Sequence, residues 1–317
     1  MIALSPDYAQ RILPYIGGSE VNSSPEQTPH RFIIDLQGHS LDEAQERYGG
    51  LVELLRTSVK PDREKRPQNE QSRYLAKRWW LWHSDRPRLQ QALRRLDRVL
   101  VNCQVGPHLA FVMQPTGRQF ALTVNVFSFR QYPVFCLLQS RVHEIWARFF
   151  ASTLEDRLRY TPSDCFETFP GPDDYPSDAS LEAIGQTYHD HRAELMVTAN
   201  EGMTKIYNRF HKDTEAGAAI QRLRELHDEM DRAVLRAYGW DDLASTLRPQ
   251  FLAEDTEGDH TYQGRYFWPA AERDLVLSRL LALNAERYAE EVRQGLHEKG
   301  RKRARDEGDE QELEVDE

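Results

Sequence analysis

The sequence is poor in the features that mark secreted, membrane and metal-binding proteins. Its 317 residues include three cysteines, Cys103, Cys136 and Cys165, which are widely spaced and form no Cys-x-x-Cys pair. An odd, scattered set argues against a disulfide framework and a zinc site, so we expect buried thiols. No apolar run approaches the roughly 18 residues of a membrane span, and no basic leader precedes an apolar block at the N-terminus. The sequence therefore predicts a cytoplasmic protein with no membrane partner.

Motifs that carry catalysis are also missing. There is no G-x-x-x-x-G-K-[ST] or G-x-G-x-x-G loop for nucleotides, and no [DNS]-P-P-[YFW] loop of the kind that amino-methyltransferases use on DNA bases. The string "PDREK" (61–65) is similar to nuclease carboxylate motifs, but those draw their residues from neighbouring strands. His189 and His191 are two apart on a predicted helix and point to different faces. We predict no catalytic residue, cofactor site or metal site in this chain.

The charge is distributed unevenly. The formal net charge is −10, yet residues 56–101 contain 13 Lys and Arg against 5 Asp and Glu, which leaves −18 for the rest of the chain. A basic segment inside an acidic protein is the expected mark of a face that binds a polyanion, because phosphates respond to the local field. A solvated helical surface would have the same composition, and charge alone does not separate the two interpretations.

Hydrophobic periodicity changes along the first half of the chain. Residues 1–40 are rich in turn formers and contain one predicted strand, Phe32–Leu36, whereas residues 41–96 have helical spacing interrupted by a turn-like "KPDREKRPQN" at 60–69. Asp85 is a predicted N-cap, with proline in the first turn of the helix that follows. Three β-rich strings separated by Gly and Pro then predict a small antiparallel sheet, at 99–103, 109–113 and 120–129.

The second half has the pattern of a helical region. Apolar residues from Phe135 to Phe149 recur at helical spacing and predict a helix packed on the sheet. The segment "RYTPSDCFETFPGP" (159–172) is too rich in helix breakers for a helix and too irregular for a strand. Three amphipathic helices are predicted beyond it, at 181–195, 220–234 and 275–288. The block-charged end, "KGRKRAR" followed by acidic residues, is typical of disorder.

Several long strings together resemble the C-terminal portion of the MmeI-like family of restriction-modification enzymes and adenine-specific DNA methyltransferases. The resemblance extends to about Gly295 and rests on "YIGGSEVNSSPEQTPHRFIIDL" (15–36), "VKPDREKR" (59–66), "KRWWLWHSDRPRL" (77–89), "LLQSRVHEIWARFFASTLEDRLRYTPSDCFETFPGP" (137–172) and "NEGMTKIYNRFHKD…LRELHDEMDRAVLRAYGWDDL" (200–243). This chain departs from the family at 169–172, where it has Phe-Pro-Gly-Pro in place of Phe-Pro-Phe-Pro.

The resemblance implies an α+β fold: a small mixed α/β target recognition domain at 1–172, a mainly helical C-terminal region at 173–297 and a disordered charged tail at 298–317. It implies recognition of double-stranded DNA for a methyltransferase or nuclease polypeptide that holds S-adenosylmethionine, since the catalytic parts are absent from this chain. The segment 159–172 would be the exit ribbon of the recognition domain, held extended by its prolines and pinned by Phe166 and Phe169 between that domain and the helical region.

Two classes of DNA contact are expected, phosphate contacts that position and base contacts that specify. For phosphates the predicted residues are Lys60, Arg63, Lys65, Arg66, Lys77 and Arg78. For base reading they are Gln114, Arg118, Gln119 and Asn125, because Arg suits guanine and Asn or Gln suits adenine. The alternative is that they are ordinary turn or strand-face residues, since long polar side chains at loop tips mostly face water. Trp79, Trp80 and Trp82 would stack on single strands or, as their apolar neighbours favour, pack in the core.

Two alternatives stay open. The chain would be a truncated, inert fragment of an adenine-specific methyltransferase, or a protein-interaction module that never touches DNA. Salt-dependent DNA binding distinguishes the second alternative from the leading hypothesis.

Overall fold

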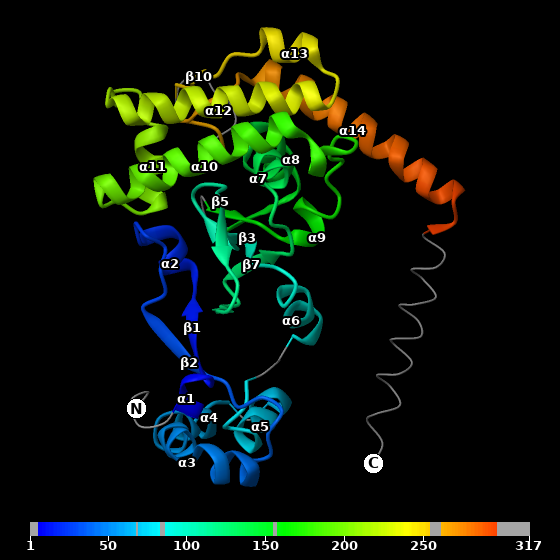
Figure 1. Cartoon of the computed structure of the whole chain (residues 1–317). Helices are drawn as coiled ribbons and strands as arrows, with labels where there is room; N and C mark the ends of the chain where they lie inside the picture. The colour runs from blue at the N-terminus through cyan, green and yellow to red at the C-terminus, as the bar shows by residue number, and fades with distance from the viewer. Residues whose placement is uncertain (1–5, 68, 83–85, 155–156, 254–260, 297–317) are drawn as a thin grey trace. The chain divides into compact units, whose positions relative to one another are not determined.

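A mixed α+β fold confirms the fold class predicted from the sequence (Figure 1). The computed structural model describes residues 6–67, 69–82, 86–154, 157–253 and 261–296, so the predicted disordered tail at 298–317 lies outside the described residues. The chain divides into two units that are discontinuous in sequence: unit 1 comprises 1–135 and 189–208, and unit 2 comprises 136–188 and 209–317. The predicted domain boundaries at residues 172 and 297 divide the chain by function and stay a prediction.

Unit 1 begins with a helical layer that has its own small core. Its helices are α1 (Pro6–Ala9), α2 (Gly18–Ser23), α3 (Leu41–Ser58), α4 (Lys60–Glu64), α5 (Glu70–Lys77) and α6 (Pro87–Leu93). Ser40 caps α3 in a capping box, with its hydroxyl accepting from the Glu43 backbone and the Glu43 carboxylate accepting from the Ser40 backbone. Leu51 and Val52 of α3 pack with Trp79 in one buried cluster. The predicted helical character of 41–96 is confirmed.

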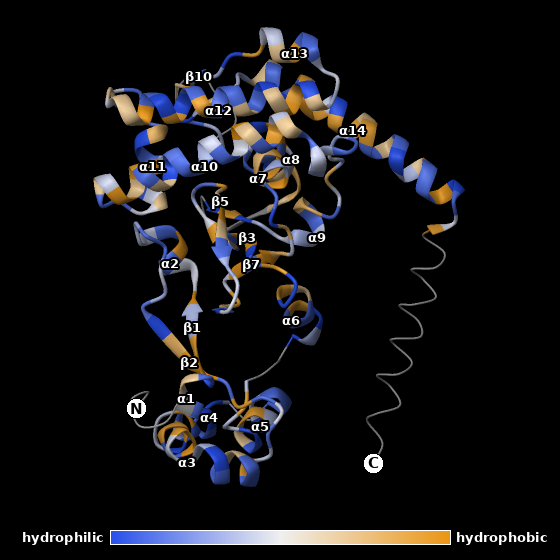
Figure 2. Ribbon diagram, viewed as in Figure 1, coloured by the Kyte–Doolittle hydropathy of each residue, from blue (hydrophilic) through white to orange (hydrophobic). Residues whose placement is uncertain are grey.

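Unit 1 also contains two three-stranded sheets and the short strand β4 (Val105–Gly106), which belongs to neither of them. The first pairs β1 (Ile12–Ile16) antiparallel with β2 (Arg31–Ile34) and parallel with β6 (Gln119–Phe120). The second places β3 (Arg98–Cys103) between β5 (Phe111–Pro115) and β7 (Val124–Phe127), with both pairings antiparallel as predicted. Of the strand predicted at 120–129, only β7 belongs to this sheet, since Phe120 pairs with β1 in the first. Figure 2 shows apolar residues concentrated in the strands of this second sheet. The sequence had indicated β2 but not β1, because Pro14 and the neighbouring glycines disguise a strand whose partners lie far along the chain.

Prolines begin short helices where the sequence had predicted loops. The turn-like 60–69 contains α4, and the segment 159–172 contains α9 (Pro162–Cys165), each with proline in its first turn. Proline suits that position because its ring fixes φ at a helical value. It has no backbone N–H, but an N–H in the first turn of a helix would have no partner within the helix in any case. The prediction that 159–172 is too rich in breakers for any helix was therefore wrong. The predicted N-cap Asp85 lies outside the described residues, and Arg86 occupies the cap position of α6.

The helical second half is confirmed and forms most of unit 2. The boundaries between the two units fall within α7 (Tyr132–Gln139), α10 (Ala179–Ala199) and α11 (Met203–Phe210). The other helices of unit 2 are α8 (Arg141–Phe150), α9, α12 (Ala218–Ala237), α13 (Asp241–Thr246) and α14 (Ala270–Arg293). Two antiparallel strand pairs also belong to it, β8 (Ser152–Leu154) with β9 (Arg157–Arg159) and β10 (Gln250–Phe251) with β11 (Tyr266–Phe267). The single helix predicted from Phe135 to Phe149 is two helices, because Ser140 ends α7 and caps α8. Among the described residues no helix is long and apolar enough to cross a membrane.

The segment 159–172 packs on α8 within unit 2. The Phe169 ring lies 4.5 Å from the His143 ring, centroid to centroid, and 6.0 Å from that of Trp146. The indole N–H of Trp146 donates to the Thr168 hydroxyl at 3.1 Å. Phe169 therefore anchors this segment to α8, whereas its predicted place between two domains stays a prediction.

A buried arginine joins α8 to α12. The Arg141 guanidinium donates to the carboxylates of Asp231 at 2.6 Å and Asp228 at 2.8 Å, and the Arg141 backbone N–H donates to Asp231 at 2.8 Å. Burial raises the pKa of Asp231 to about 6, although Arg141 acts in the opposite direction. Because Arg141 is 1% exposed, both charges depend on this pairing.

Candidate nucleic-acid interface

Among the six predicted phosphate-binding residues, Arg63 on α4 already uses its side chain in contacts within the protein. The Arg63 guanidinium is half-buried and donates to the backbone carbonyls of Leu75, Arg78 and Leu81 at 3.3, 3.1 and 2.7 Å. Burial and the neighbouring Arg66 charge lower the pKa of Arg63. Arg63 thus ties α4 to the end of α5, and its donors serve the fold.

The other phosphate candidates are more accessible. Lys60 is half-buried, with its ammonium 3.8 Å from the Glu64 carboxylate and 5.8 Å from the Trp79 ring. Lys65, Arg66, Lys77 and Arg78 are exposed. Arg78 also donates to the Tyr74 hydroxyl at 2.7 Å and lies 4.9 Å from its ring. Four of the six predicted cations therefore present charge to solvent in and around α4 and α5.

The base-reading candidates lie on or beside the strands of unit 1. Gln114 on β5 is 3% exposed, and its side-chain oxygen accepts from the Arg118 guanidinium at 2.8 Å. Burial lowers the pKa of Arg118. Asn125 on β7 faces Asn102 on β3 and donates to its side-chain oxygen at 3.0 Å. Of these three candidates, Gln114 is the one whose side chain faces the protein interior.

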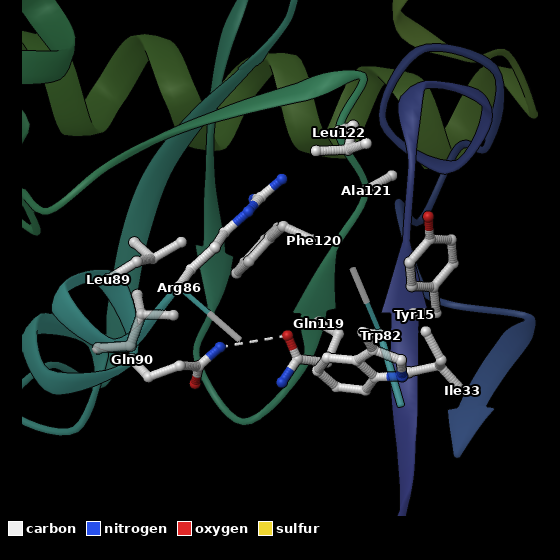
Figure 3. A pocket seen from close by; sticks show the side chains of 11 residues that line it. Tyr15, Ile33, Trp82, Arg86, Leu89, Gln90, Gln119, Phe120, Ala121 and Leu122 are labelled. Carbon is white, nitrogen blue, oxygen red and sulfur yellow. Dashed lines mark hydrogen bonds between the residues drawn. The ribbon is translucent and has the colours of Figure 1, made fainter. Parts of the chain in front are cut away.

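Gln119, the fourth candidate, lies at a hollow of about 160 Å³ between α6 and the β1–β6 pair (Figure 3). Its walls are mostly apolar and aromatic, and are formed by Tyr15, Ile33, Trp82, Leu89, Leu93, Phe120, Ala121 and Leu122. The Trp82 indole donates to the Ile34 carbonyl at 2.9 Å, and the Arg31 guanidinium lies 5.2 Å from the Tyr15 ring. These contacts fix the orientation of both aromatic walls.

Polar groups are few in this hollow and face one another. The Gln90 amide on α6 donates to the Gln119 amide oxygen at 3.2 Å, as the dashed line in Figure 3 marks. Arg86 lines the same space and has φ 48° and ψ 60°, a backbone conformation that residues other than glycine rarely adopt. The sequence had not indicated Gln90 as a site residue, because its partner Gln119 lies 29 positions later in the chain. Arg86 had been noted only as part of the start of a helix.

The three tryptophans pack in the protein, which confirms the core interpretation. Trp79 is 5% exposed within the helical core of unit 1, and Trp80 packs against that core. The Trp80 indole donates to the His39 carbonyl at 3.1 Å, as Trp82 does to Ile34. Only Trp82 also lines the hollow, so it combines a structural contact with access to a ligand.

The string "NEGMTKIYNRF" makes a turn against α2 within unit 1. Asn200 has φ 50°, and a Cβ added at Gly202 would lie 2.4 Å from the Ser23 backbone. The close approach leaves no room for a side chain, so glycine is required at 202.

The cysteines, histidines and carboxylates of the described residues are the side chains that could act as metal ligands or nucleophiles. Within the described ranges, no group of three or more His, Cys, Asp and Glu could hold a metal ion. Burial raises the pKa of the Cys103 thiol to about 12 and that of Cys165 to about 11, which suppresses the thiolate that a nucleophile requires. The pKa of Glu20 in unit 1 is lowered to about 2, chiefly by hydrogen bonds from Arg31.

Comparison with known proteins supports the fold. No protein-family profile and no curated protein matches the chain. Among solved structures, the chain is similar to the Type IIL restriction-modification enzyme MmeI in complex with DNA, with a TM-score of 0.56 and 17% sequence identity over 91% of this chain. The match covers 32% of that enzyme, so this chain spans about a third of its length. At this identity the likeness shows a shared fold.

Proposed function

We propose that this chain recognises double-stranded DNA for an adenine-specific methyltransferase or restriction-modification system. The catalytic parts and the S-adenosylmethionine site belong to a second polypeptide. Cations around α4 and α5 contact phosphates, and side chains beside β5, β6 and β7 read bases. The observation that carries the proposal is the exposure of Lys65, Arg66, Lys77 and Arg78 in the same unit as these strands. The shared fold with an enzyme solved on DNA supports it.

The contacts refine the expected roles. Lys65, Arg66, Lys77 and Arg78 are the primary phosphate ligands, with Lys60 able to join them by leaving Glu64. Arg63 orders the segment through its three carbonyl contacts. Arg118 and Gln119 are the foremost base readers, since Gln114 is buried and holds Arg118 in place.

The test is duplex binding by the purified chain as a function of salt. Each phosphate contact contributes about 0.9 to the slope of log K against log salt, so four to six contacts predict a slope between about −3.6 and −5.4. Fluorescence anisotropy on a labelled duplex measures it. A slope near zero, or no binding at low salt, would exclude DNA recognition and favour the protein-interaction alternative.

A second assay addresses the catalytic partner. A methyltransferase encoded beside this chain is expected to methylate plasmid DNA at one defined motif only when the chain is added. Methylation that is indifferent to the chain contradicts the proposed division of labour.

A further inference from the structure

The hollow between α6 and β6 has mostly apolar walls and few polar groups. Apolar and aromatic side chains form its walls, and Leu122 beside it is 77% exposed. A cavity of about 160 Å³ bounded by Tyr15, Phe120 and Trp82 suits a flat molecule with apolar faces (Figure 3). Its polar lining consists chiefly of the Gln90 and Gln119 amides and Arg86.

The amide pair leaves hydrogen-bonding capacity inside the hollow. Gln90 and Gln119 share one hydrogen bond, from the Gln90 side-chain nitrogen to the Gln119 side-chain oxygen. Among the described residues, the Gln90 side-chain oxygen accepts no hydrogen bond and the Gln119 side-chain nitrogen donates none. One acceptor and one donor thus remain side by side, in whichever direction the shared bond runs. This pattern matches the polar edge of a nucleobase, which offers a donor next to an acceptor.

Charge narrows the choice of ligand further. The segment from 56 to 101 has 13 basic against 5 acidic residues, and α6 is flanked by Arg86 and Arg88 at its start and Arg94 and Arg95 at its end. This charge complements the phosphates of a polyanion and gives a neutral ligand no advantage. The unusual backbone conformation of Arg86 is of the kind that occurs at ligand-binding sites.

We propose that this hollow takes up one unpaired nucleobase from the bound DNA, so that Gln90 and Gln119 bind its polar edge and Tyr15, Trp82 and Phe120 hold its faces. The inference rests on the proposed function, because it requires DNA on this unit. It adds Gln90 and Arg86 to the specificity-determining residues and gives Leu122 a place beside the displaced base, where it fills the gap left in the stack.

The experiment compares two duplexes of the same sequence, one fully paired and one with a single unpaired 2-aminopurine. The full chain is expected to bind the second duplex about tenfold more tightly, in line with the discrimination that paired amide contacts give. The 2-aminopurine emission is expected to fall on binding, because the base stacks on aromatic side chains.

Two matched variants test whether the preference for the unpaired duplex comes from the hollow or from the greater flexibility of that DNA. Gln90→Leu is expected to reduce the tenfold preference, the ratio of the two affinities, to about twofold. Gln91→Leu, on the exposed side of the same helix, is expected to leave the preference intact. Thermal melting of both variants verifies that each is folded.

The outcomes distinguish this inference from the proposed function. Salt-dependent binding of the paired duplex with no preference for the unpaired base overturns the inference alone. A preference that persists in Gln90→Leu also overturns it. Failure to bind either duplex at low salt overturns the proposed function and the inference together.

Discussion

Arginine serves opposite purposes in two regions of this molecule. In unit 2, Arg141 is buried and spends its donors on Asp228 and Asp231. In the helical segment of unit 1, Arg66 and Arg78 are exposed beside lysines that face solvent. A buried and an exposed arginine count alike in the composition, yet only the exposed one offers its charge to a ligand. The comparison teaches that accessibility, and not composition, decides which cations can hold DNA.

Arg63 shows that structural arginines are found in unit 1 as well as in unit 2. It belongs to the basic segment by sequence, but its three carbonyl contacts resemble those of Arg224 in unit 2, which donates to the carbonyls of Phe210 and Lys212. Carbonyls at helix ends lack partners within the helix, and a guanidinium can satisfy several of them at once. Arginines of this kind stabilise chain turns and are poor choices for phosphate contacts.

The largest effect is expected from removing the buried cation of unit 2. Arg141→Met should lower the free energy of unfolding by about 3–5 kcal/mol, because Asp231 is left buried without its partner. Urea denaturation measures the loss. Adding Asp231→Leu to the same variant should recover part of it, since the unpaired charge is then gone. A loss below about 1 kcal/mol for Arg141→Met would break the contrast between the two regions.

Arg63 and Arg78 provide the next test within one segment. Arg63→Met should lower the free energy of unfolding by about 2 kcal/mol, because three carbonyls lose a charged donor. Arg78→Met should change stability by less than about 1 kcal/mol and weaken DNA binding. Chemical denaturation and anisotropy on the same preparations check both effects. Equal losses of stability would show that exposure does not separate their roles.

The Arg31–Glu20 pair makes stability depend on acid pH. The pKa of Glu20 is lowered from 4.5 to about 2, so its contribution is complete above pH 4.5 and is lost as pH falls toward 2. Because Arg31 is half-exposed, we expect that contribution to be about 1–2 kcal/mol. Glu20→Gln should flatten this part of the stability profile, measured by urea denaturation between pH 2 and pH 6. An unchanged profile would contradict the assignment.

The smallest effect on stability is expected at the exposed lysines. Lys65→Ala combined with Lys77→Ala should change the free energy of unfolding by no more than about 0.5 kcal/mol. The same variant should reduce the magnitude of the salt slope for duplex binding by about 1.8, through two lost phosphate contacts. Lys212→Ala, exposed in unit 2, is the control and should leave the slope unchanged. An unaltered slope in the double variant would remove these lysines from the interface.

Much of the fold could be predicted because local periodicity matched tertiary packing. The antiparallel strands around β3 and the helices α10 and α12 bury most of the residues that their spacing indicates. In α14 the spacing was a poorer guide, since Leu280 is buried but Leu275, Leu281 and Tyr288 are exposed. Failures occurred where a proline began a helix, as at Pro61 and Pro162, or where a strand found distant partners, as β1 does with β6. The candidate site was predicted only in part, since Gln90 gains its meaning from Gln119 across the hollow.

The sequence by itself determined where most helices and strands would form and that residues 56–101 would be basic, because periodicity and charge are local properties of the chain. Tertiary structure alone decided that Arg63 would bind carbonyls, that Gln114 would be buried and that Gln90 would meet Gln119. Such roles depend on which donors and acceptors remain unsatisfied after distant segments pack, and no local pattern contains that information.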